Sequence, residues 1–325
     1  MSRGESVAQI GKRNDIRSPT GFHRLAAVAP IDTSTTTMYK CKLPQELIDI
    51  IIDNLDNDDS RVLRGCALVC RSWLPVARRK IFHKVVLWPP NARYNKRPTD
   101  ISYSIRLDRA LISSPPIANY IQELRVYEGQ LLRNQDWIEA DPTLPLLLPK
   151  LTSLTRIELR RLEWTTVPTD LRRSLCGVLE LPSLMSVEIE KATFDNIDDL
   201  ASLLCCAKGL TNFSLIGTYI GNTTPPMHKD EGREEKAEES GLRSRVQRHF
   251  VSLRLGLASS HTMFIDWLLG PRSPWDVSHI HTLEILDSHQ ADTPATNRLL
   301  HAIGNSLGQL KLRVPWNMSN TGERL

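Results

Sequence analysis

Residues 154–194 read LTRIELRRLEWTTVPTDLRRSLCGVLELPSLMSVEIEKATF, and the period of their apolar residues changes twice. Apolar and polar residues alternate from Leu154, follow a helical period from Leu171 to Leu179, and alternate again from Leu184. Alternation is typical of a strand with two unlike faces, and a period of about 3.6 is typical of an amphipathic helix. These residues are therefore predicted to form a strand, a helix and a second strand.

The same unit recurs along the second half of the chain. Alternating segments also begin at Ile121, Leu210, Phe250, His281 and Leu307. The first inward residues of the strands recur at intervals of about 30 residues, at Leu124, Ile157, Val187, Phe213, Leu253, Leu283 and Leu310. Helical periods lie between the strands at Leu171–Leu179, Ile197–Ala207, Thr262–Leu269 and Ala295–Leu307.

A unit of this size cannot bury its apolar face alone, so neighbouring units are expected to stack. We therefore predict a curved α/β solenoid over residues 89–325, with parallel strands along its concave side. A doubly wound α/β sheet also alternates strand and helix, and it is the competing prediction. No glycine-rich phosphate loop follows any of these strands, which disfavours a nucleotide-binding sheet.

A helical module is predicted at residues 40–88. The first helix covers Leu43 to Leu55, LPQELIDIIIDNL, with Pro44 suited to the first helical position and an apolar stripe at Leu47, Ile48, Ile51, Ile52 and Leu55. A second helix is predicted in RVLRGCALVCRSW, residues 61–73, and a third from Pro75 to Phe82. A strand then follows from Lys84 to Leu87.

This module is too small to be stable on its own. Its first helix carries a wider apolar face than one neighbouring helix could cover, so we expect a partner on that face. The alternative is a helical bundle that buries the stripe against its own C-terminal domain.

Three strings of the module resemble the F-box, and in particular the F-box-like domains of fungal proteins. They are Leu43-Pro44-x-Glu46-Leu47-Ile48-x-x-Ile51, Leu63-x-x-Cys66-x-Leu68-Val69-Cys70-Arg71-x-Trp73 and Ala77-Arg78-x-x-Ile81-Phe82. The resemblance implies docking on the Skp-type adaptor of a cullin-based (SCF) ubiquitin ligase. The repeats, in turn, resemble the irregular leucine-rich repeats of many F-box proteins, which implies that their concave side binds a target protein.

The resemblance also implies which residues contact the adaptor. Position by position these are Leu43, Pro44, Leu47, Ile48, Ile51 and Leu55 of the first helix, with Leu63, Leu68 and Val69 of the second. Trp73, Ile81 and Phe82 are expected to pack inside the module instead.

The remaining segments are predicted to lie outside the folded parts. Residues 1–39 are polar and aperiodic, which is typical of a disordered tail. Residues 222–245 are charged and are expected to form a mobile loop within the repeats. After the last predicted strand the chain reads VPWNMSNTGERL with no further helix, so the last repeat is expected to be exposed or the sequence to be a fragment.

Composition limits the compartment and the partners. The net charge of +4, from 41 basic and 37 acidic residues, is too balanced to indicate nucleic acid or a membrane surface. No apolar run approaches the roughly 18 residues of a membrane span. The six cysteines form no CxxC pair and lie mostly in apolar helical patterns, which indicates a reducing compartment, cytoplasmic or nuclear. Basic residues in the tail leave a mitochondrial transit peptide as a weaker alternative.

The residue pattern offers only weak candidates for a chemical site. His279 and His281 are expected to share a strand face and could supply two zinc ligands, but no further ligands are evident. Cys66 and Cys70 lie one helical turn apart on the apolar face and are expected to be core residues. No GxSxG motif occurs. The basic residues Arg71, Arg78, Arg79, Lys80 and Lys84 suit an acidic protein partner better than nucleic acid.

The sequence therefore predicts an α+β protein with two folded domains, a three-helix F-box-like module at 40–88 and a leucine-rich-repeat-like domain at 89–325. It predicts a substrate-recognition adaptor of a ubiquitin ligase, without catalytic residues, cofactor or metal. The alternative is a repeat-based interaction scaffold that acts outside any ligase. The target protein is not identifiable from the residues.

Overall fold

The computed structural model describes residues 43–55, 60–89, 102–128, 137–221, 248–257, 260–286 and 293–313. These residues all belong to one compact unit, Leu43–Leu325. Three predicted segments lie outside the described residues. They are the tail at 1–39, the loop at 222–245 and the C-terminal VPWNMSNTGERL.

The N-terminal part contains the three helices and the strand that the sequence predicts. They are α1 (Gln45–Asp53), α2 (Ser60–Val69), α3 (Trp73–Phe82) and β1 (Lys84–Leu87). Pro44 precedes α1 with an extended backbone, and its carbonyl accepts the N–H of Leu47 and Ile48. The prediction that the second helix continues to Trp73 was wrong, because residues 70–72 form a turn in which the Cys70 carbonyl accepts the Trp73 N–H.

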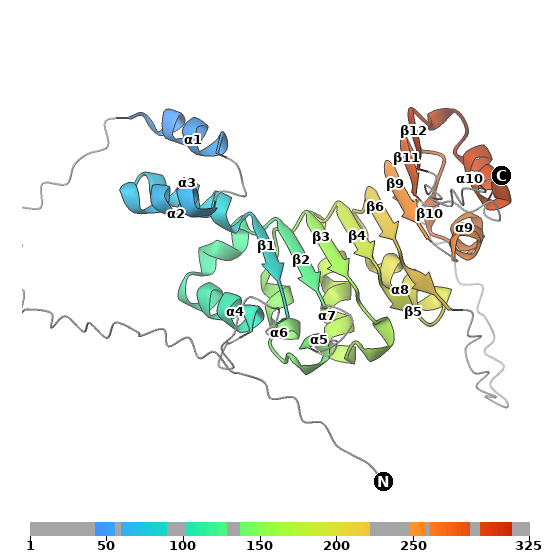
Figure 1. Ribbon diagram of the computed structural model, residues 1–325, viewed down its shortest axis with the longest axis horizontal. Helices are drawn as coiled ribbons and strands as arrows, with labels where there is room; N and C mark the ends of the chain where they lie inside the picture. Colours follow the sequence, from blue (N-terminus) through green and yellow to red (C-terminus); the bar gives the residue numbers. More distant parts are fainter. Residues whose placement is uncertain are drawn as a thin grey trace, which may run out of the picture. The chain divides into compact units, whose positions relative to one another are not determined.

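The strands of the main sheet follow one another in space in the order of the sequence. Eight strands pair in the order β1-β2-β3-β4-β6-β9-β11-β12, and each pair is parallel. After β1 they are β2 (Glu123–Tyr127), β3 (Arg156–Arg160), β4 (Ser186–Glu190), β6 (Asn212–Ile216), β9 (Ser252–Gly256), β11 (Thr282–Leu286) and β12 (Gln309–Arg313). The protein is therefore α+β with an open parallel sheet (Figure 1).

The predicted inward positions lie in one register across this sheet. Leu124 pairs with Ile157, and the row continues through Val187, Phe213, Leu253 and Leu283 to Leu310. Val85 of β1 extends the row by pairing with Leu124. The side chains from Leu124 to Leu283 are buried, whereas Leu310 is exposed. The repeat spacing in the sequence thus predicted the strand register correctly.

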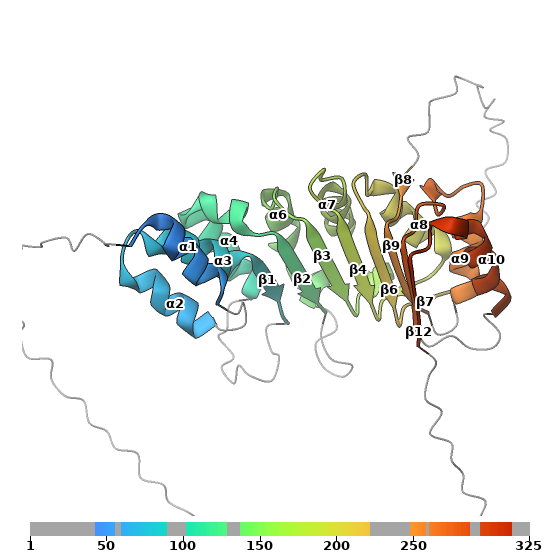
Figure 2. The ribbon, with the colours of Figure 1, turned by 90° about the horizontal axis from the view of Figure 1, so that it is seen from above.

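The competing doubly wound arrangement does not fit the described sheet. A doubly wound sheet reverses its strand order at a switch point and carries helices on both faces. Here the order never reverses, and Figure 2 shows α6, α7 and α8 on the same side of the sheet. None of the described helices covers the opposite side of the strands over this central part (Figure 2), and we call that side the open face.

The principal helices behind the sheet start near their predicted positions. They are α7 (Thr169–Leu179), α8 (Ile197–Cys206), α9 (His261–Leu269) and α10 (Thr293–Ile303). The prediction that the last of them reaches Leu307 was wrong. Gly304 takes a left-handed backbone, φ +62°, and residues 304–306 form a short 3-10 helix, η6.

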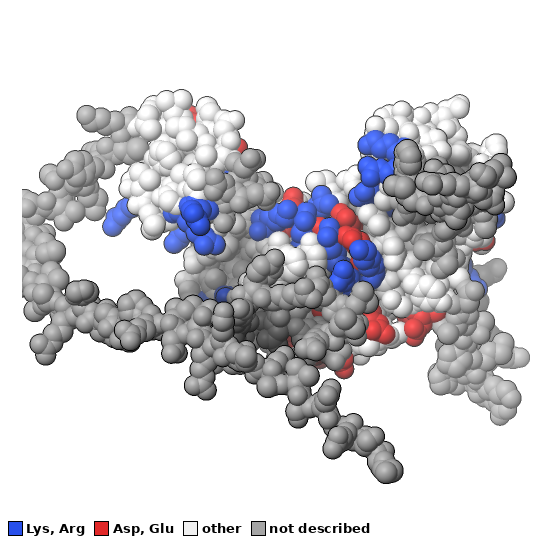
Figure 3. All heavy atoms as spheres, in the orientation of Figure 1, with Lys and Arg blue, Asp and Glu red and all other residues white. Residues whose placement is uncertain are grey.

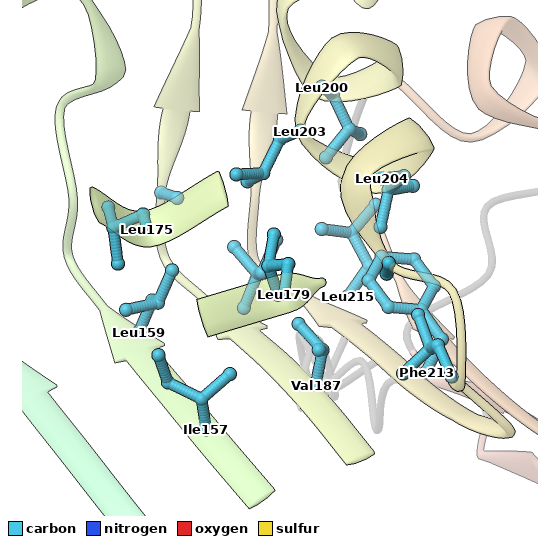
Figure 4. Close-up of a cluster of buried hydrophobic side chains, with 14 of the residues drawn as sticks. Ile157, Leu159, Leu175, Leu179, Val187, Leu200, Leu203, Leu204, Phe213 and Leu215 are labelled. Atoms are coloured by element: carbon cyan, nitrogen blue, oxygen red, sulfur yellow. The ribbon is translucent and has the colours of Figure 1, made fainter. Parts of the chain in front are cut away.

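The core lies between these helices and the strands. Figure 4 shows Leu175 and Leu179 of α7 above Ile157 and Leu159 of β3, and Leu200, Leu203 and Leu204 of α8 near Phe213 and Leu215 of β6. The Phe213 ring packs on the rings of Phe250 and Phe264, with centroids 5.8 and 6.1 Å away. Each helix thus covers the inward residues of the strands beside it.

Several helical elements between β1 and β3 were not predicted. They are α4 (Tyr103–Ser113), η2 (Pro115–Tyr120), α5 (Trp137–Ala140), α6 (Leu144–Leu147) and η3 (Leu148–Lys150). The Ser102 hydroxyl caps α4 by accepting the N–H of Ile105. Only Leu107 and Leu111 provide buried large apolar side chains in α4, so the apolar period there is short. Among the described helices, none is long and apolar enough to cross a membrane.

A left-handed residue ends each of three consecutive strands. Arg161, Lys191 and Gly217 follow β3, β4 and β6 with φ of 58°, 56° and 58°. Their N–H groups donate to the last residues of the next strands, as from Arg161 to the Glu190 carbonyl at 2.7 Å. Short strands follow this turn, among them β5 (Thr193–Phe194) and β7 (Tyr219–Ile220), and a separate pair joins β8 (Arg248–His249) to β10 (Trp275–Asp276). The same left-handed turn therefore follows three neighbouring strands of the sheet.

Candidate interaction surfaces

The first helix carries an exposed apolar surface, which we call the α1 patch. It consists of Leu43, Pro44, Leu47, Ile50 and Ile51. Leu47 keeps 46% of its area exposed and Ile51 keeps 42%. Residues three and four apart on a helix are neighbours, so these side chains form one continuous stripe. The patch includes four of the predicted contact residues, and it adds Ile50, which the sequence analysis did not select.

Other predicted contact residues lie inside the module. Ile48 and Leu63 are buried, as is Ile52, and Leu55 is half-buried. The structure brings α1 against α3 and α2 against α3. Ile48 and Leu63 therefore support the surface from beneath and have no free area for a partner in this conformation.

The second helix carries a smaller apolar surface. Leu68 is 87% exposed, and Val62 and Val69 are also exposed. Val62 and Val69 lie seven residues apart, about two helical turns, so they face the same way. Leu68 and Val69 are predicted contact residues, and the structure leaves both of them accessible.

Polar contacts fix α1 on the rest of the module. The Lys80 ammonium donates to the Asp53 carbonyl at the end of α1, at 2.6 Å. A cation at this position also favours the negative end of the helix dipole. The Gln45 amide donates to the Ser72 carbonyl in the turn before α3, at 3.5 Å. These contacts set which face of α1 is turned outward.

The open face of the sheet carries a ladder of ion pairs. Arg125 on β2 contacts Glu158 on β3 at 2.7 Å, and Arg156 on β3 contacts Glu188 on β4 at 2.6 Å. Arg160 pairs with both Glu158 and Glu190, the latter at 2.8 Å. Figure 3 shows blue and red side chains alternating over these strands. Opposite charges facing one another across strands stabilise the pairing.

Glu158 lies at the centre of this ladder, and its side chain is only 1% exposed. A buried carboxylate is costly unless it is paired, and two guanidinium groups pair it here. Burial alone would lower the pKa of Arg160, but the attraction of the Glu158 and Glu190 carboxylates outweighs it and holds that pKa above its usual value. The Arg160 guanidinium therefore stays charged at neutral pH.

The same carboxylates form the only group with metal-ligand geometry among the described residues. One oxygen each from Glu158, Glu188 and Glu190 lies within 4.8 Å of the others. Each of these carboxylates already contacts an arginine. The arrangement is thus that of an ion-pair network, in which the arginines supply the compensating charge.

An aromatic stack lies beside the ladder. The rings of Trp88 and Tyr127 are stacked with centroids 4.3 Å apart and an angle of 10° between their planes. The Arg160 guanidinium lies 5.0 Å from the centroid of Tyr127. Trp88 is partly exposed, so this stack presents an aromatic surface at one end of the open face.

The signal for the ladder was present in the sequence. The polar positions of the alternating segments hold arginine and glutamate in RIELR of β3, and serine and glutamate in SVEIE of β4. The strand prediction depended only on the apolar positions of these segments. Once the register is known, the polar positions follow by the period of two, and Arg125, Glu158 and Glu188 fall in one row.

The two histidines considered as zinc ligands do not share a strand face. β11 begins at Thr282, after both of them. His279 Nε2 lies 3.7 Å from an Asp276 carboxylate oxygen, and His281 Nδ1 lies 3.3 Å from the Ser306 carbonyl. They therefore have separate structural contacts.

The described cysteines are all free thiols: Cys66, Cys70, Cys176, Cys205 and Cys206. Cys66 and Cys70 are half-buried, so the expected core position holds only in part, and Cys70 lies in the turn after α2. Burial, together with a hydrogen bond involving Cys176, raises the pKa of Cys206 to about 12. That thiol is therefore protonated and weakly nucleophilic at neutral pH.

One shallow hollow lies on the helical side, lined in part by Leu148, Leu151, Val178 and Leu181. Its one charged lining residue, Arg173, is paired with Asp170 at 3.0 Å. The Ser174 hydroxyl in its lining donates to the Pro145 carbonyl at 2.9 Å, so the hollow presents a mainly apolar wall.

No protein-family model matches this chain, and no curated protein shows significant similarity to it. Functional inference therefore depends on the surfaces described above and on the residues that carry the F-box resemblance.

Proposed function

We propose that this protein is a substrate-recognition adaptor of an SCF-type ubiquitin ligase, with an F-box-like module from residue 40 to 88 and a leucine-rich-repeat-like solenoid after it. The α1 patch is the observation that carries the proposal. Four of its exposed residues stand at positions that the resemblance assigns to contact with the Skp-type adaptor. They are Leu43, Pro44, Leu47 and Ile51.

The energetics of the α1 patch favour a protein partner. Each large apolar side chain contributes roughly 1.5–3 kcal/mol when it passes from full exposure to full burial. The patch residues are about half exposed, so each would contribute a fraction of that amount. Side chains of this kind clustered on one helix are typical of an interface that another protein covers.

In this proposal the sheet domain binds the target. The open face offers the ion-pair ladder and the exposed Trp88, which suit a polar protein surface with an aromatic contact. The chain would then act by holding a target close to the ubiquitin-charged enzyme, which raises the effective concentration of target lysines. The chain itself would contribute no catalytic group.

A capture experiment tests the docking face. The full chain carrying both Leu47→Asp and Ile51→Asp should lose capture by a purified Skp-type adaptor, because each change places a charge in an apolar contact. Ile112→Asp is the matched control, since Ile112 on α4 is 67% exposed and lies outside the patch. Circular dichroism of all variants establishes that they are folded.

Equal capture of the double variant and the wild type would reject the docking face. Failure of the wild-type chain to bind the adaptor would reject the ligase role and favour the alternative, a repeat-based scaffold whose α1 patch is covered by another protein. Co-capture of a cullin with the wild-type chain, lost in the double variant, would support assembly into a ligase.

A further inference from the structure

The last described strand of the sheet, β12, leaves one edge without a neighbour among the described residues. β12 pairs with β11 alone, and all five of its residues are exposed. Leu310 and Leu312 keep 42% and 55% of their area exposed, whereas their register partners Leu283 and Ile285 are buried. β12 therefore has the alternating apolar residues of an interior strand, but it lies at the edge of the described sheet.

The backbone of β12 is oriented for a further strand. The Gln309 N–H donates to the His281 carbonyl at 2.9 Å, so the backbone groups of Gln309 point toward β11. Backbone groups of successive residues in a parallel strand point to opposite sides. The N–H and C=O groups of Leu310 and Leu312 therefore point to the free edge, where another chain can bind them.

The charges near this edge define what kind of strand fits. Elsewhere on the open face, neighbouring strands place arginine opposite glutamate, as in Arg125 with Glu158 and Arg160 with Glu190. At the edge, Glu284 on β11 contacts Arg254 at 3.1 Å and Arg313 at 3.6 Å. Among the described carboxylates none forms an ion pair with Lys311. The edge thus has an excess of positive charge.

We propose that β12 is a strand-addition site for an extended segment of another protein in which acidic and apolar side chains alternate. The main chain of that segment bonds to Leu310 and Leu312. Its apolar side chains cover Leu310 and Leu312, and its acidic side chains lie opposite Lys311 and Arg313 on the open face. The segment continues the charge pattern of the sheet by one strand. This site does not depend on the α1 patch or on the proposed role in a ligase.

A second copy of the chain is a poor occupant of this edge. Pairing two β12 strands would bring Lys311 and Arg313 of both copies onto the same face, and β12 contains no acidic residue. Like charges on neighbouring strands destabilise the pairing. Lysine on an edge strand is a common means of preventing self-association, and it leaves pairing with an acidic segment open.

Binding of a synthetic peptide to the full chain tests the proposal. The probe is a short, capped, fluorescent peptide in which valine alternates with glutamate, and its control has lysine in place of glutamate. Fluorescence anisotropy should show binding of the glutamate peptide and at least about tenfold weaker binding of the lysine peptide, because several cross-strand charge pairs change sign together. Equal binding of both peptides would overturn the proposal.

Two variants separate strand addition from surface adhesion. Leu312→Thr keeps the backbone donor, whereas Leu312→Pro removes an N–H that points to the free edge, a position where an edge strand tolerates proline. Binding should survive in the threonine variant and fall at least about tenfold further in the proline variant. Equal binding by the two variants, with circular dichroism showing both folded, would overturn strand addition.

Charge reversal gives a readout that does not depend on proline. Lys311→Glu should weaken binding of the glutamate peptide roughly fivefold and strengthen that of the lysine peptide by a similar factor. Unchanged preference would exclude the proposed register. Sedimentation of the wild type checks the other occupant: a dimer that Leu312→Pro dissolves would assign the edge to a second copy and overturn the acidic partner. Adaptor capture through α1 should be unchanged in all of these variants.

Discussion

The middle of the sheet and the three-helix module differ in the burial of their apolar residues and in the pairing of their charged residues. Between β2 and β11 the aligned inward residues are buried, and the arginines and glutamates of the open face are paired across strands. In the module, Leu47, Ile51 and Leu68 are exposed. Its arginines on α2 and α3, such as Arg64 and Arg78, form no ion pair with any described carboxylate.

This difference separates two uses of the same residue types. In the sheet, leucine and isoleucine provide the chain with its own core, and their effect should appear in stability. In the module, some of them remain exposed, and their effect should appear in binding. The prediction of an interaction role therefore concerns the residues that the fold leaves uncovered. Two pairs of substitutions compare the sheet with the module, and a third compares the ladder with an exposed ion pair.

The largest expected contrast is between a core residue and an exposed one. Phe213→Ala should lower the free energy of unfolding by about 3–5 kcal/mol, because it leaves a cavity among Phe250, Phe264 and the helices behind β6. Leu68→Ala, at a residue 87% exposed, should change it by less than about 0.5 kcal/mol. Urea denaturation measures both. A cost at Leu68 comparable with that at Phe213 would mean that α2 is covered by the chain itself.

The sheet was predictable because its signal is repeated. Seven segments share one period, and a shift of one residue would turn every inward side chain outward, so the register from Leu124 to Leu310 followed from the pattern. The ends of helices were less predictable, since they depend on single backbone conformations. The left-handed Gly304 ends α10 early, and the turn at 70–72 ends α2 before Trp73.

The surfaces were less predictable than the core. An apolar residue on a helix can face the core or a partner, and the sequence period does not distinguish these when the stripe is wide. The run Ile50-Ile51-Ile52 illustrates this, because the structure exposes the first two and buries the third. The burial of Ile48 depends on how α1 packs on its neighbours, among them α3, and no local pattern in α1 contains that information.

The second contrast concerns ion pairs. Glu158→Gln should lower the free energy of unfolding by about 1–3 kcal/mol, because it leaves Arg125 and Arg160 facing an uncharged group at a site with little access to water. Asp170→Asn removes the carboxylate of the exposed pair with Arg173 and should change it by less than about 1 kcal/mol. Thermal or urea unfolding at neutral pH compares the two. Equal effects would contradict the structural role assigned to the ladder.

The smallest contrast uses one substitution that should have opposite signs in the two regions. Gly217 has φ +58°, and an added Cβ would lie 3.2 Å from Lys191 Cγ, so Gly217→Ala should lower stability by about 1–2 kcal/mol. Gly65 lies within α2 with nothing within 4 Å of an added Cβ, so Gly65→Ala should stabilise that helix by about 0.5–1 kcal/mol. Urea unfolding measures the first change, and hydrogen exchange of the α2 amides measures the second. A stabilising effect of Gly217→Ala would contradict the left-handed turn. A loss of hydrogen-exchange protection in α2 would mean that Gly65 faces a covered surface, and the contrast between the sheet and the module would then be smaller.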